Sequence, residues 1–398
     1  MNPSLIRSRS IAVTWLLGFA AVGIVGSVIL FPSQSFEASL GGLGLWWNII
    51  FPALLPYYIL CEIITAYGLP AIFGKVGIPL WRILKLPAPA GQAVASAMLT
   101  GYPAGTEETA RLRRSGLVGR KDAERIMMIA HFANPVLIFT IVSAVYLQRP
   151  ELGVFIIVIH FGSLMISMFL FPLISMIKLQ SNMEMSDRLE RIQSTVKPTL
   201  GYILGNAVAD SLQRLMQLGG VIIMFSVAIR LIEELGIIGL MLRFLQEVLG
   251  IMVARDMIIS IVSGILEPHL GTYAFSQALV LPTVWKLSLI SSALAWGGLA
   301  IHLQVRATLR GTDIRYAPFL AARITQACIA CGMTLLLWKP YETQFPSTRL
   351  SFSSHSDTHN SISGLWVVPH SNMVLSIIVV VTILVLLYFR TFRRSIKS

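Results

Sequence analysis

The chain has 398 residues, of which 55% are hydrophobic and only 13% are charged, and its mean hydropathy is +0.74. A soluble globular domain carries about 25% charged residues, so this composition excludes a soluble protein of this size. The formal net charge is +12. Because the basic residues stand in short loops between apolar runs, they indicate the positive-inside arrangement of a membrane protein rather than a nucleic-acid-binding surface.

The apolar runs are about 20 residues long, which is the length of a membrane-spanning helix and about twice that of a barrel strand. Spanning helices satisfy their own backbone hydrogen bonds in lipid. The sequence therefore predicts an all-α fold, a polytopic membrane helical bundle. In chain order, the eight predicted full spans are residues 11–31, 45–67, 122–147, 151–178, 217–235, 286–305, 316–338 and 373–390.

The charges of the loops predict the orientation of these spans. With the N-terminus in the cytoplasm, the basic clusters fall on the cytoplasmic side, and Arg149 and Arg349 are the exceptions in the outer loops. An even number of spans then returns the C-terminus to the cytoplasm. The first apolar run is too long for the core of an ordinary signal peptide and is predicted to be an uncleaved anchor. We therefore expect a multi-pass protein of the cell membrane with both termini cytoplasmic.

Two further apolar stretches, residues 91–110 and 255–281, do not fit as spans. Each is broken at mid-length by Gly and Pro, and counting either one as a full span would invert every later loop. They are predicted to be re-entrant hairpins that enter and leave on the same side. A broken helix at membrane depth is tolerated where protein buries it or where it lines a wet cavity.

The two hairpins belong to an internal repeat. The first break, residues 101–106, is followed about thirty residues later by His131-Phe132-Ala133-Asn134-Pro135. The second, residues 267–272, is followed at similar spacing by Trp296-Gly297-Gly298. By the predicted topology the first hairpin enters from the cytoplasm and the second from outside. This pattern is typical of the inverted repeats of secondary transporters, whose substrate sites lie near the midplane where such elements meet.

The predicted spans and hairpins divide the chain into successive parts. These are an anchor span with an outer loop (1–44), a first repeat (45–178), a cytoplasmic linker with an amphipathic segment (179–216), a second repeat (217–339), and an outer loop with a C-terminal span (340–398). Residues 201–216 and 236–250 are amphipathic and are predicted to lie along the membrane interface.

Candidate binding residues stand at the second hairpin tip, around Glu267. An ionisable group inside an apolar stretch costs a few kcal/mol, so it is expected to be paired or functional. Glu267 fits a coupling carboxylate for H⁺ or Na⁺, or a cap on the half-helix that begins with Pro268. His269 is a candidate partner of Glu267 or a cavity-lining residue. The same tip contributes the candidates Gly271 and Thr272.

The other candidates lie in the first repeat. Asn134 before Pro135 offers an amide to a ligand, or marks a helix kink only. His131 fits the same face, or a hydrogen bond to a neighbouring helix. The first hairpin tip contributes Tyr102, Gly105 and Thr106, and the half-helix that follows them presents free N–H groups suited to a carboxylate.

Two observations bear on whether an anion binds there. Glu107 and Glu108 occupy the first turn of the half-helix after the tip, where they stabilise its dipole and compete with an anion, or reach the cytoplasmic surface. Arg315 and Arg323 are candidates to attract a dianion, although Arg315 also fits a positive-inside anchor.

Three stretches of the sequence carry a resemblance. Residues 100–135 combine a GYP-x-G tip, a basic loop, the helix start Asp122-Ala123-Glu124-Arg125 and an Asn-Pro break. Residues 311–324 form the second stretch, and the Glu267 tip with Gly271 forms the third. Together they resemble the YlbJ, or SpoVV, family of sporulation integral membrane proteins, over roughly residues 45–340.

The resemblance has functional implications. The family belongs with the nucleoside-recognition, or Gate, domain proteins, which are related to concentrative nucleoside transporters. For the sporulation members it implies carriage of dipicolinate (dipicolinic acid) across the outer forespore membrane. This sequence differs from the family pattern at His131-Phe132-Ala133 and at the Glu107-Glu108 pair. These differences leave the ligand open.

The hypothesis is therefore a secondary membrane transporter of a small organic anion that acts in spore formation. An ion-coupled nucleoside transporter and a non-transporting spore-envelope assembly protein are the alternatives. The sequence has no G-x-x-x-x-G-K-[ST], H-E-x-x-H or G-x-S-x-G motif, so an enzyme is not expected. No cofactor or metal is expected beyond a coupling H⁺ or Na⁺. The expected partners are the anion and the lipid bilayer, with no nucleic acid, and a homo-oligomer is left open.

Overall fold

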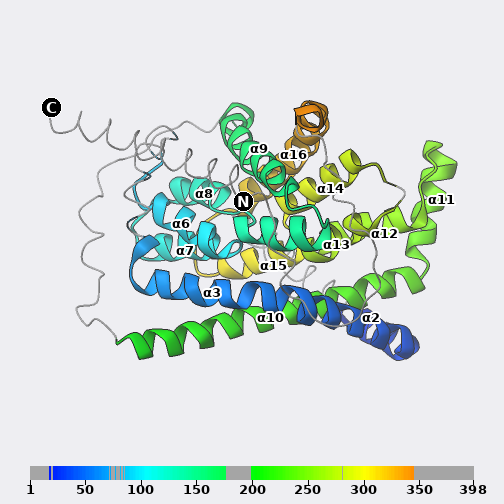
Figure 1. Ribbon diagram of the computed structural model, residues 1–398, viewed down its shortest axis with the longest axis horizontal. Helices are drawn as coiled ribbons and strands as arrows, with labels where there is room; N and C mark the ends of the chain where they lie inside the picture. The colour runs from blue at the N-terminus through cyan, green and yellow to red at the C-terminus, as the bar shows by residue number, and fades with distance from the viewer. Residues whose placement is uncertain are drawn as a thin grey trace, which may run out of the picture.

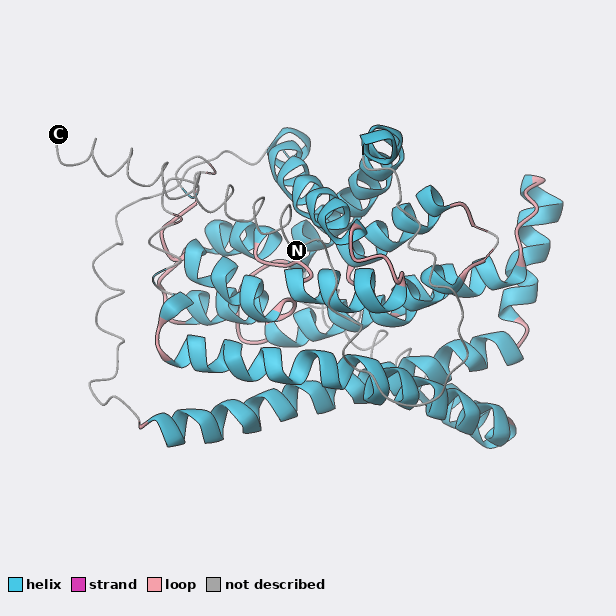
Figure 2. Ribbon diagram, in the orientation of Figure 1, coloured by secondary structure: helices cyan, strands magenta, loops and turns pink. Residues whose placement is uncertain are grey.

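The computed structural model describes residues 18, 21–70, 72, 77, 81, 84, 86–175, 199–279 and 281–344. Throughout these residues the chain is helix joined by short loops, with no strand (Figure 2). The predicted all-α helical bundle is therefore confirmed. Five helical stretches within the described residues are long and apolar enough to cross a membrane: Pro32–Ala66, Leu152–Leu170, Leu200–Glu234, Thr283–Thr308 and Tyr316–Gln344.

The first of these stretches is one continuous helical rod. It consists of α2 (Pro32–Leu45), the short π-helix η1 (Trp46–Ile50) and α3 (Phe51–Ala66). The span expected to begin at residue 45 therefore begins at Pro32, and the expected boundary at 44/45 falls inside a helix. Pro32 is at the first helical position, where a missing N–H costs nothing. Most of the predicted 11–31 span lies outside the described residues, although residues 21–30 are helical.

The first repeat contains both expected breaks. α6 (Ala90–Thr100) ends at Gly101, whose φ of 79° suits glycine, and α7 (Ala104–Arg114) begins three residues later. After a short loop, α8 (Arg120–Ile129) stops before a non-helical segment at residues 131–134, and the π-helix η2 (Leu137–Tyr146) follows. The predicted 122–147 span is thus two short helices. α9 (Leu152–Ser175) completes this half.

The connection between the repeats differs from the prediction. α10 (Leu200–Glu234) is one helix of 35 residues, which includes both the expected interfacial segment 201–216 and the expected span 217–235. The predicted boundary at 216/217 falls inside this helix, because an amphipathic start and an apolar end share one unbroken helix. α11 (Ile237–Leu249) then projects from the bundle with only Ile238 buried (Figure 1). The expected linker at 179–198 lies outside the described residues.

The second repeat follows the plan of the first. α12 (Arg255–Leu266) and α13 (Pro268–Gln277) form the hairpin, broken at Glu267. α14 (Thr283–Trp296) and α15 (Gly298–Thr308) form the following span, broken at Gly297. α16 (Tyr316–Gln344) passes the predicted boundary at 339/340 as an unbroken helix. The predicted C-terminal span and the rest of the outer loop lie outside the described residues.

Contacts between the helices relate the two halves. Within each half the arms of the hairpin pack together, α6 on α7 and α12 on α13. Between halves, the second arm of each hairpin packs on the last part of the other half's broken span, α7 on α15 and α13 on η2. α8 contacts α16 just as α14 contacts α9. The equivalent contacts show a structural repeat. Entry of the hairpins from opposite sides of a membrane stays a prediction.

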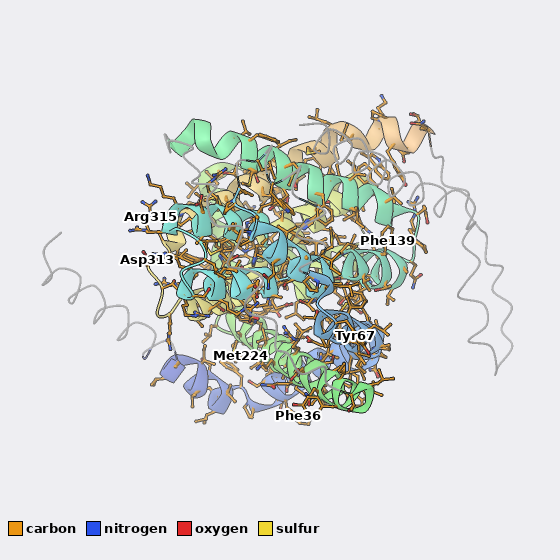
Figure 3. The ribbon with its side chains drawn as sticks, turned by 90° about the vertical axis from the view of Figure 1, so that its left-hand side faces the viewer. Phe36, Tyr67, Phe139, Met224, Asp313 and Arg315 are labelled. Carbon is orange, nitrogen blue, oxygen red and sulfur yellow. The ribbon has the colours of Figure 1, made fainter. Side chains whose placement is uncertain are left out.

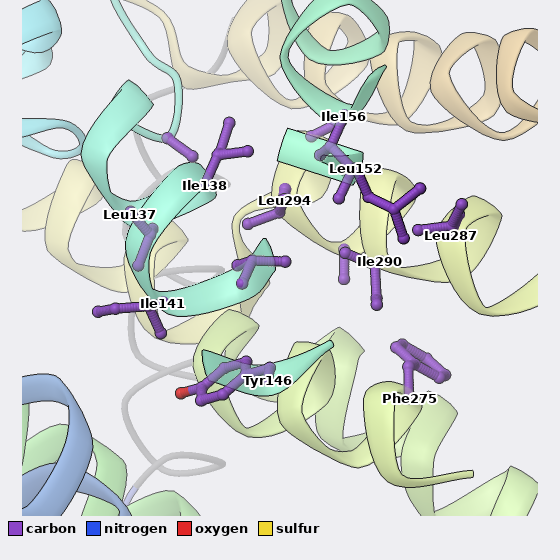
Figure 4. Close-up of a cluster of buried hydrophobic side chains, with 14 of the residues drawn as sticks. Leu137, Ile138, Ile141, Tyr146, Leu152, Ile156, Phe275, Leu287, Ile290 and Leu294 are labelled. Atoms are coloured by element: carbon purple, nitrogen blue, oxygen red, sulfur yellow. The ribbon is translucent and has the colours of Figure 1, made fainter. Parts of the chain in front are cut away.

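The core between the halves is apolar and tightly packed (Figure 4). Its centre is formed by branched side chains from η2, α9 and α14, among them Ile138, Ile141, Leu152, Ile156 and Ile290. Small polar groups join the helices that surround it, since Ser288 and Ser292 on α14 donate to the carbonyls of Cys331 and Ala327 on α16 at 3.0 Å each. Such bonds hold helices together in lipid, where burial of apolar surface supplies no drive for association.

Candidate functional site

The four helix interruptions of the two repeats meet in the middle of the molecule. A Cβ on Gly101 would lie 3.2 Å from Nδ2 of Asn134, so the first hairpin break rests on the following span's break. In the second repeat a Cβ on Gly298 would lie 3.1 Å from Cα of Glu267. The halves are joined by His131, whose Nε2 would be 3.5 Å from a Cβ on Gly297. The broken backbone of both repeats is therefore gathered at one place.

A cavity of about 570 Å³ lies beside these interruptions. It is lined by parts of α3, the first hairpin, α10 and α15. Its polar lining residues are Tyr58, Thr100, Tyr102, Glu107, Asn134, Arg214, Gln217, His269, Gln304 and Thr308. A volume of this size is typical of ligand pockets, which run from about 300 to 1,000 Å³. Of the predicted residues, the structure brings together Tyr102, Asn134 and His269 on its wall.

A second cavity of about 610 Å³ adjoins the first. The two share Thr100, Glu107, Arg214, Ala307 and Thr308, so they adjoin along a common wall. We call the first the central cavity and the second the vestibule. The vestibule is strongly charged, with Glu62, Glu107, Glu108, Arg111, Arg114, Arg214 and Arg310 on its wall. Charged residues therefore line the approach to the central cavity, whose inner part is lined by amides, hydroxyls and apolar groups.

The end of α6 that borders the cavity is held by α3. The last carbonyls of a helix have no partner within it. Here Tyr57, Cys61 and Tyr58 of α3 donate to the carbonyls of Met98, Leu99 and Thr100, at 3.4, 3.3 and 3.5 Å respectively. The three contacts anchor the tip of the first hairpin to α3, which positions Tyr102 in the central cavity.

Glu267 and His269 lie close together, as the sequence suggested. Oε1 of Glu267 lies 2.6 Å from Nδ1 of His269, and Oε2 accepts a 2.6 Å hydrogen bond from the backbone N–H of Leu270. Glu267 is fully buried and caps α13, so the expected cap is present. His269 reaches the central cavity while Glu267 stands behind it. Any change in the charge of Glu267 would therefore act on the cavity through His269.

Tyr102, Thr106 and His131 form a second connected group. Thr106 Oγ1 lies 3.1 Å from His131 Nδ1, and the His131 ring stacks on Tyr102 with centroids 5.3 Å apart. Within the described residues His131 Nε2 and Tyr102 Oη are buried without a hydrogen-bond partner. Thr106 and His131 stand one layer behind the cavity wall.

Asn134 plays a structural part and also faces the cavity. Its Oδ1 accepts a 2.7 Å hydrogen bond from the N–H of Leu137 and thereby starts η2. Its amide nitrogen lies on the side of Gly101 and the central cavity. The kink predicted at Asn134-Pro135 is present, and the amide remains available to a ligand.

The remaining candidates, Gly105, Gly271 and Thr272, do not line either cavity. The two glycines allow close contacts between helices. A Cβ on Gly105 would meet the Ala130 carbonyl oxygen at 1.9 Å, and one on Gly271 would meet Gly264 Cα at 2.1 Å. Thr272 Oγ1 donates back to the Pro268 carbonyl at 2.7 Å. These three residues support the arms of the hairpins rather than contacting the cavity.

Two important residues near the break of the first span were not predicted to be there. Arg323 on α16 is fully buried and donates to the carbonyls of Met128 and His131 at 2.5 and 2.6 Å. His160 on α9 accepts from the N–H of Ala133 at 3.1 Å. The expectation that Arg323 attracts a dianion is not supported, because its guanidinium donates hydrogen bonds to carbonyls at the end of α8, where a positive charge is favoured.

Sequence reasoning also missed the cavity residues of α10 and α15. Arg214 comes from the part of α10 that was predicted to lie along the interface, Gln217 is the first residue of the span predicted to follow it, and Gln304 comes from α15. An arginine within a largely apolar helix was the available signal, since such a residue usually faces a partner or a cavity.

Ion pairs join the two repeats beyond the vestibule. Arg113 on α7 makes a two-point contact with Asp313, Nε to Oδ1 at 2.8 Å and Nη2 to Oδ2 at 2.9 Å. This contact lowers the pKa of the exposed Asp313 carboxyl below its ordinary value. Asp313 and Arg315 lie at one edge of the molecule (Figure 3). The loops after α7 and α15, both predicted to be cytoplasmic, therefore lie at the same end.

The broken hairpins, the broken spans and the cavity beside them define a helical membrane protein built from two structurally related halves. The chain is 33% identical over 356 residues to the sporulation integral membrane protein YlbJ of Bacillus subtilis (strain 168), covering 86% of each protein. It belongs to the YlbJ family, which confirms the resemblance seen in the sequence. No protein-family model and no solved structure matches the chain.

Proposed function

We propose that this protein is a secondary carrier that moves a small organic anion across a membrane during spore formation, with dipicolinate as the substrate. The observation that carries the proposal is the meeting of four helix interruptions beside a cavity that continues into an arginine-bearing vestibule. Interruptions at membrane depth are costly unless they line a cavity. In secondary transporters such elements form the substrate site and the moving parts.

The charge of the vestibule favours an anion. Arg111, Arg114 and Arg310 line it together with Arg214, which also reaches the central cavity. Four arginines face three glutamates there, so the vestibule has a small excess of positive charge, and its guanidinium groups can pair with a carboxylate. The name of the Bacillus subtilis relative supports a role in sporulation and a place in a membrane. The proposed location is the outer forespore membrane, as the resemblance to the sporulation family implies.

The buried carboxyl of Glu267 is the proposed coupling group. It is fully buried, it contacts His269, and His269 reaches the cavity. A proton or Na⁺ bound or released at Glu267 would thus change the hydrogen bonding of a residue on the cavity wall. The proposed protein is thus a carrier coupled to H⁺ or Na⁺, not an enzyme.

A nucleoside is the second candidate substrate. Asn134, Gln217 and Gln304 place three side-chain amides on the wall of the central cavity. Amides pair well with the edges of a nucleobase and need no charge on the ligand. This alternative predicts transport that does not depend on the arginines of the vestibule.

The test is uptake of radiolabelled dipicolinate into proteoliposomes, with uridine as the second substrate. Saturable dipicolinate uptake by the wild type that is lost in Glu267→Gln supports the proposal. The control Glu247→Gln removes an exposed carboxylate of α11, away from both cavities, and is expected to transport normally. Uptake of uridine alone would move the assignment to a nucleoside carrier. Absence of any flux through folded protein would favour an assembly role.

A further inference from the structure

Arg214 lies where the central cavity and the vestibule join. It belongs to α10 and lines both spaces. Across from it, on α3, stands Glu62, which lines the vestibule. Nε of Arg214 lies 3.1 Å from Oε1 of Glu62, and the two side chains are 40% and 15% exposed. The ion pair therefore stands where the two spaces adjoin.

The guanidinium of Arg214 is little used by the protein. It has five N–H donors, yet the only partner found for it within the described residues is Glu62, through Nε. Other arginines of this region are engaged more fully. Arg111 contacts both carboxylate oxygens of Glu108 at 2.8 and 2.7 Å, and Arg323 donates to two carbonyls. Arg214 therefore keeps the planar set of donors that matches a carboxylate.

The neighbours of Arg214 complete a polar site. Gln217 stands one turn further along α10, and Gln304 and Thr308 of α15 line the same wall. Tyr58 and Glu62 are one turn apart on α3, so Tyr58 lies next to the ion pair on the cavity side. A carboxylate at Arg214 would thus have amide and hydroxyl groups within the same cavity for the rest of the ligand.

We infer that Arg214 binds a carboxylate of the substrate, and that Glu62 is an internal counter-ion which holds Arg214 when the substrate is absent. The inference rests on the proposed anion-carrier function and names the residue that recognises the anion. Exchange of one carboxylate for another keeps the guanidinium of Arg214 paired with a carboxylate both before and after the substrate binds. The displaced Glu62 remains among Arg111, Arg114 and Arg310 of the vestibule.

The experiment measures binding by calorimetry to the full chain in lipid nanodiscs. The ligands are dipicolinate, with two carboxylates, and uridine, with none. Arg214→Gln is expected to weaken dipicolinate binding about 10- to 100-fold, the loss of a charge-assisted contact. Arg214→Lys keeps the charge but not the planar set of donors, so its affinity for dipicolinate is expected to lie between those of the wild type and Arg214→Gln. Glu62→Gln removes the competing carboxylate and is expected to tighten binding about two- to fivefold.

Arg243→Gln is the matched control, because it removes an exposed arginine of α11 that lines neither cavity, and its binding should equal that of the wild type. Melting temperature and elution volume report folding, and Arg214→Lys carries the test if Arg214→Gln does not fold. Unchanged dipicolinate binding in both Arg214 variants would overturn the inference and leave the carrier proposal standing. Weaker binding in a folded Glu62→Gln would also overturn it. A wild type that binds uridine alone, or neither ligand, overturns both proposals.

Discussion

Glu124 and Arg315 hold the two halves of the protein together. Both carboxylate oxygens of Glu124 contact the Arg315 guanidinium at 2.8 Å, and the backbone N–H of Arg315 donates to Oε1 at 3.1 Å. Arg120, one turn before Glu124 on α8, donates to the same oxygen at 3.2 Å. The Glu124 side chain is only 3% exposed although Arg315 is half exposed. A buried carboxylate of the first repeat is therefore satisfied mainly by the second repeat.

The first prediction concerns this contact. Arg315→Gln removes two charge-assisted hydrogen bonds from a buried carboxylate and is expected to lower stability by about 1–3 kcal/mol. The measurement is thermal unfolding of the purified protein in detergent. Arg310→Gln is the control, since Arg310 is exposed and its side chain donates no hydrogen bond within the described residues. Equal melting temperatures for the two variants would show that the Glu124–Arg315 contact does not stabilise the fold.

The second prediction concerns pH. Hydrogen bonding to Arg113 lowers the pKa of Asp313 below its ordinary value of 3.8. Because the pKa of Asp313 is lower in the folded than in the unfolded state, the ion pair stabilises the fold fully at a pH above the unfolded-state pKa. This stabilisation is lost as the pH falls through the folded-state pKa. Asp313→Asn should therefore melt below the wild type near pH 7, and the difference should shrink once the pH falls below about 3.8. A difference that stays constant over that range would contradict the assigned ion pair.

Local features of the sequence were sufficient to locate the helix breaks. Gly101, Asn134-Pro135, Glu267-Pro268 and Gly297-Gly298 each disturb the backbone by their own chemistry, and the structure interrupts its helices at these positions. Glu267 was also recognisable, because a carboxylate before a proline inside an apolar run suits a helix cap.

Residues that act across the fold could not be located in this way. Arg323 binds the carbonyls of Met128 and His131 from nearly two hundred residues away, and no pattern near Arg323 indicates that partner. Arg214 was hidden for a different reason. The polar face of α10 fits an interfacial helix equally well, and only the packing of α10 against α3 turns that face toward a cavity.

The third prediction separates the two roles of Glu267. Glu267→Gln keeps an oxygen that can accept from the Leu270 N–H, so the α13 cap survives while the charge is lost. Glu267→Ala removes both the charge and the capping oxygen, and the lost cap is expected to lower the stability by about 1 kcal/mol relative to Glu267→Gln. Transport is therefore expected to fail in both variants, with a lower melting temperature in Glu267→Ala only. Full transport by Glu267→Gln would show that the residue is a cap and not a coupling group.

The last prediction concerns the close contact at the first hairpin. Gly105 packs so tightly that a Cβ would lie 1.9 Å from the Ala130 carbonyl oxygen and 2.8 Å from Cβ of Ala97. The first of these atoms is backbone and cannot turn away, so Gly105→Ala must push α7 from the break of the first span. Overpacking of this kind costs about 1–3 kcal/mol, and it would also displace Thr106 from His131.

Gly239→Ala is the matched control for this substitution. Gly239 lies in helix α11 with no atom within 4 Å of its Cβ position. Alanine there should leave stability unchanged or raise it by up to about 1 kcal/mol, because glycine is the poorer helix former. Thermal unfolding compares the two variants with the wild type. A Gly105→Ala protein as stable as Gly239→Ala would mean that α7 and the break do not pack as closely as the structure shows.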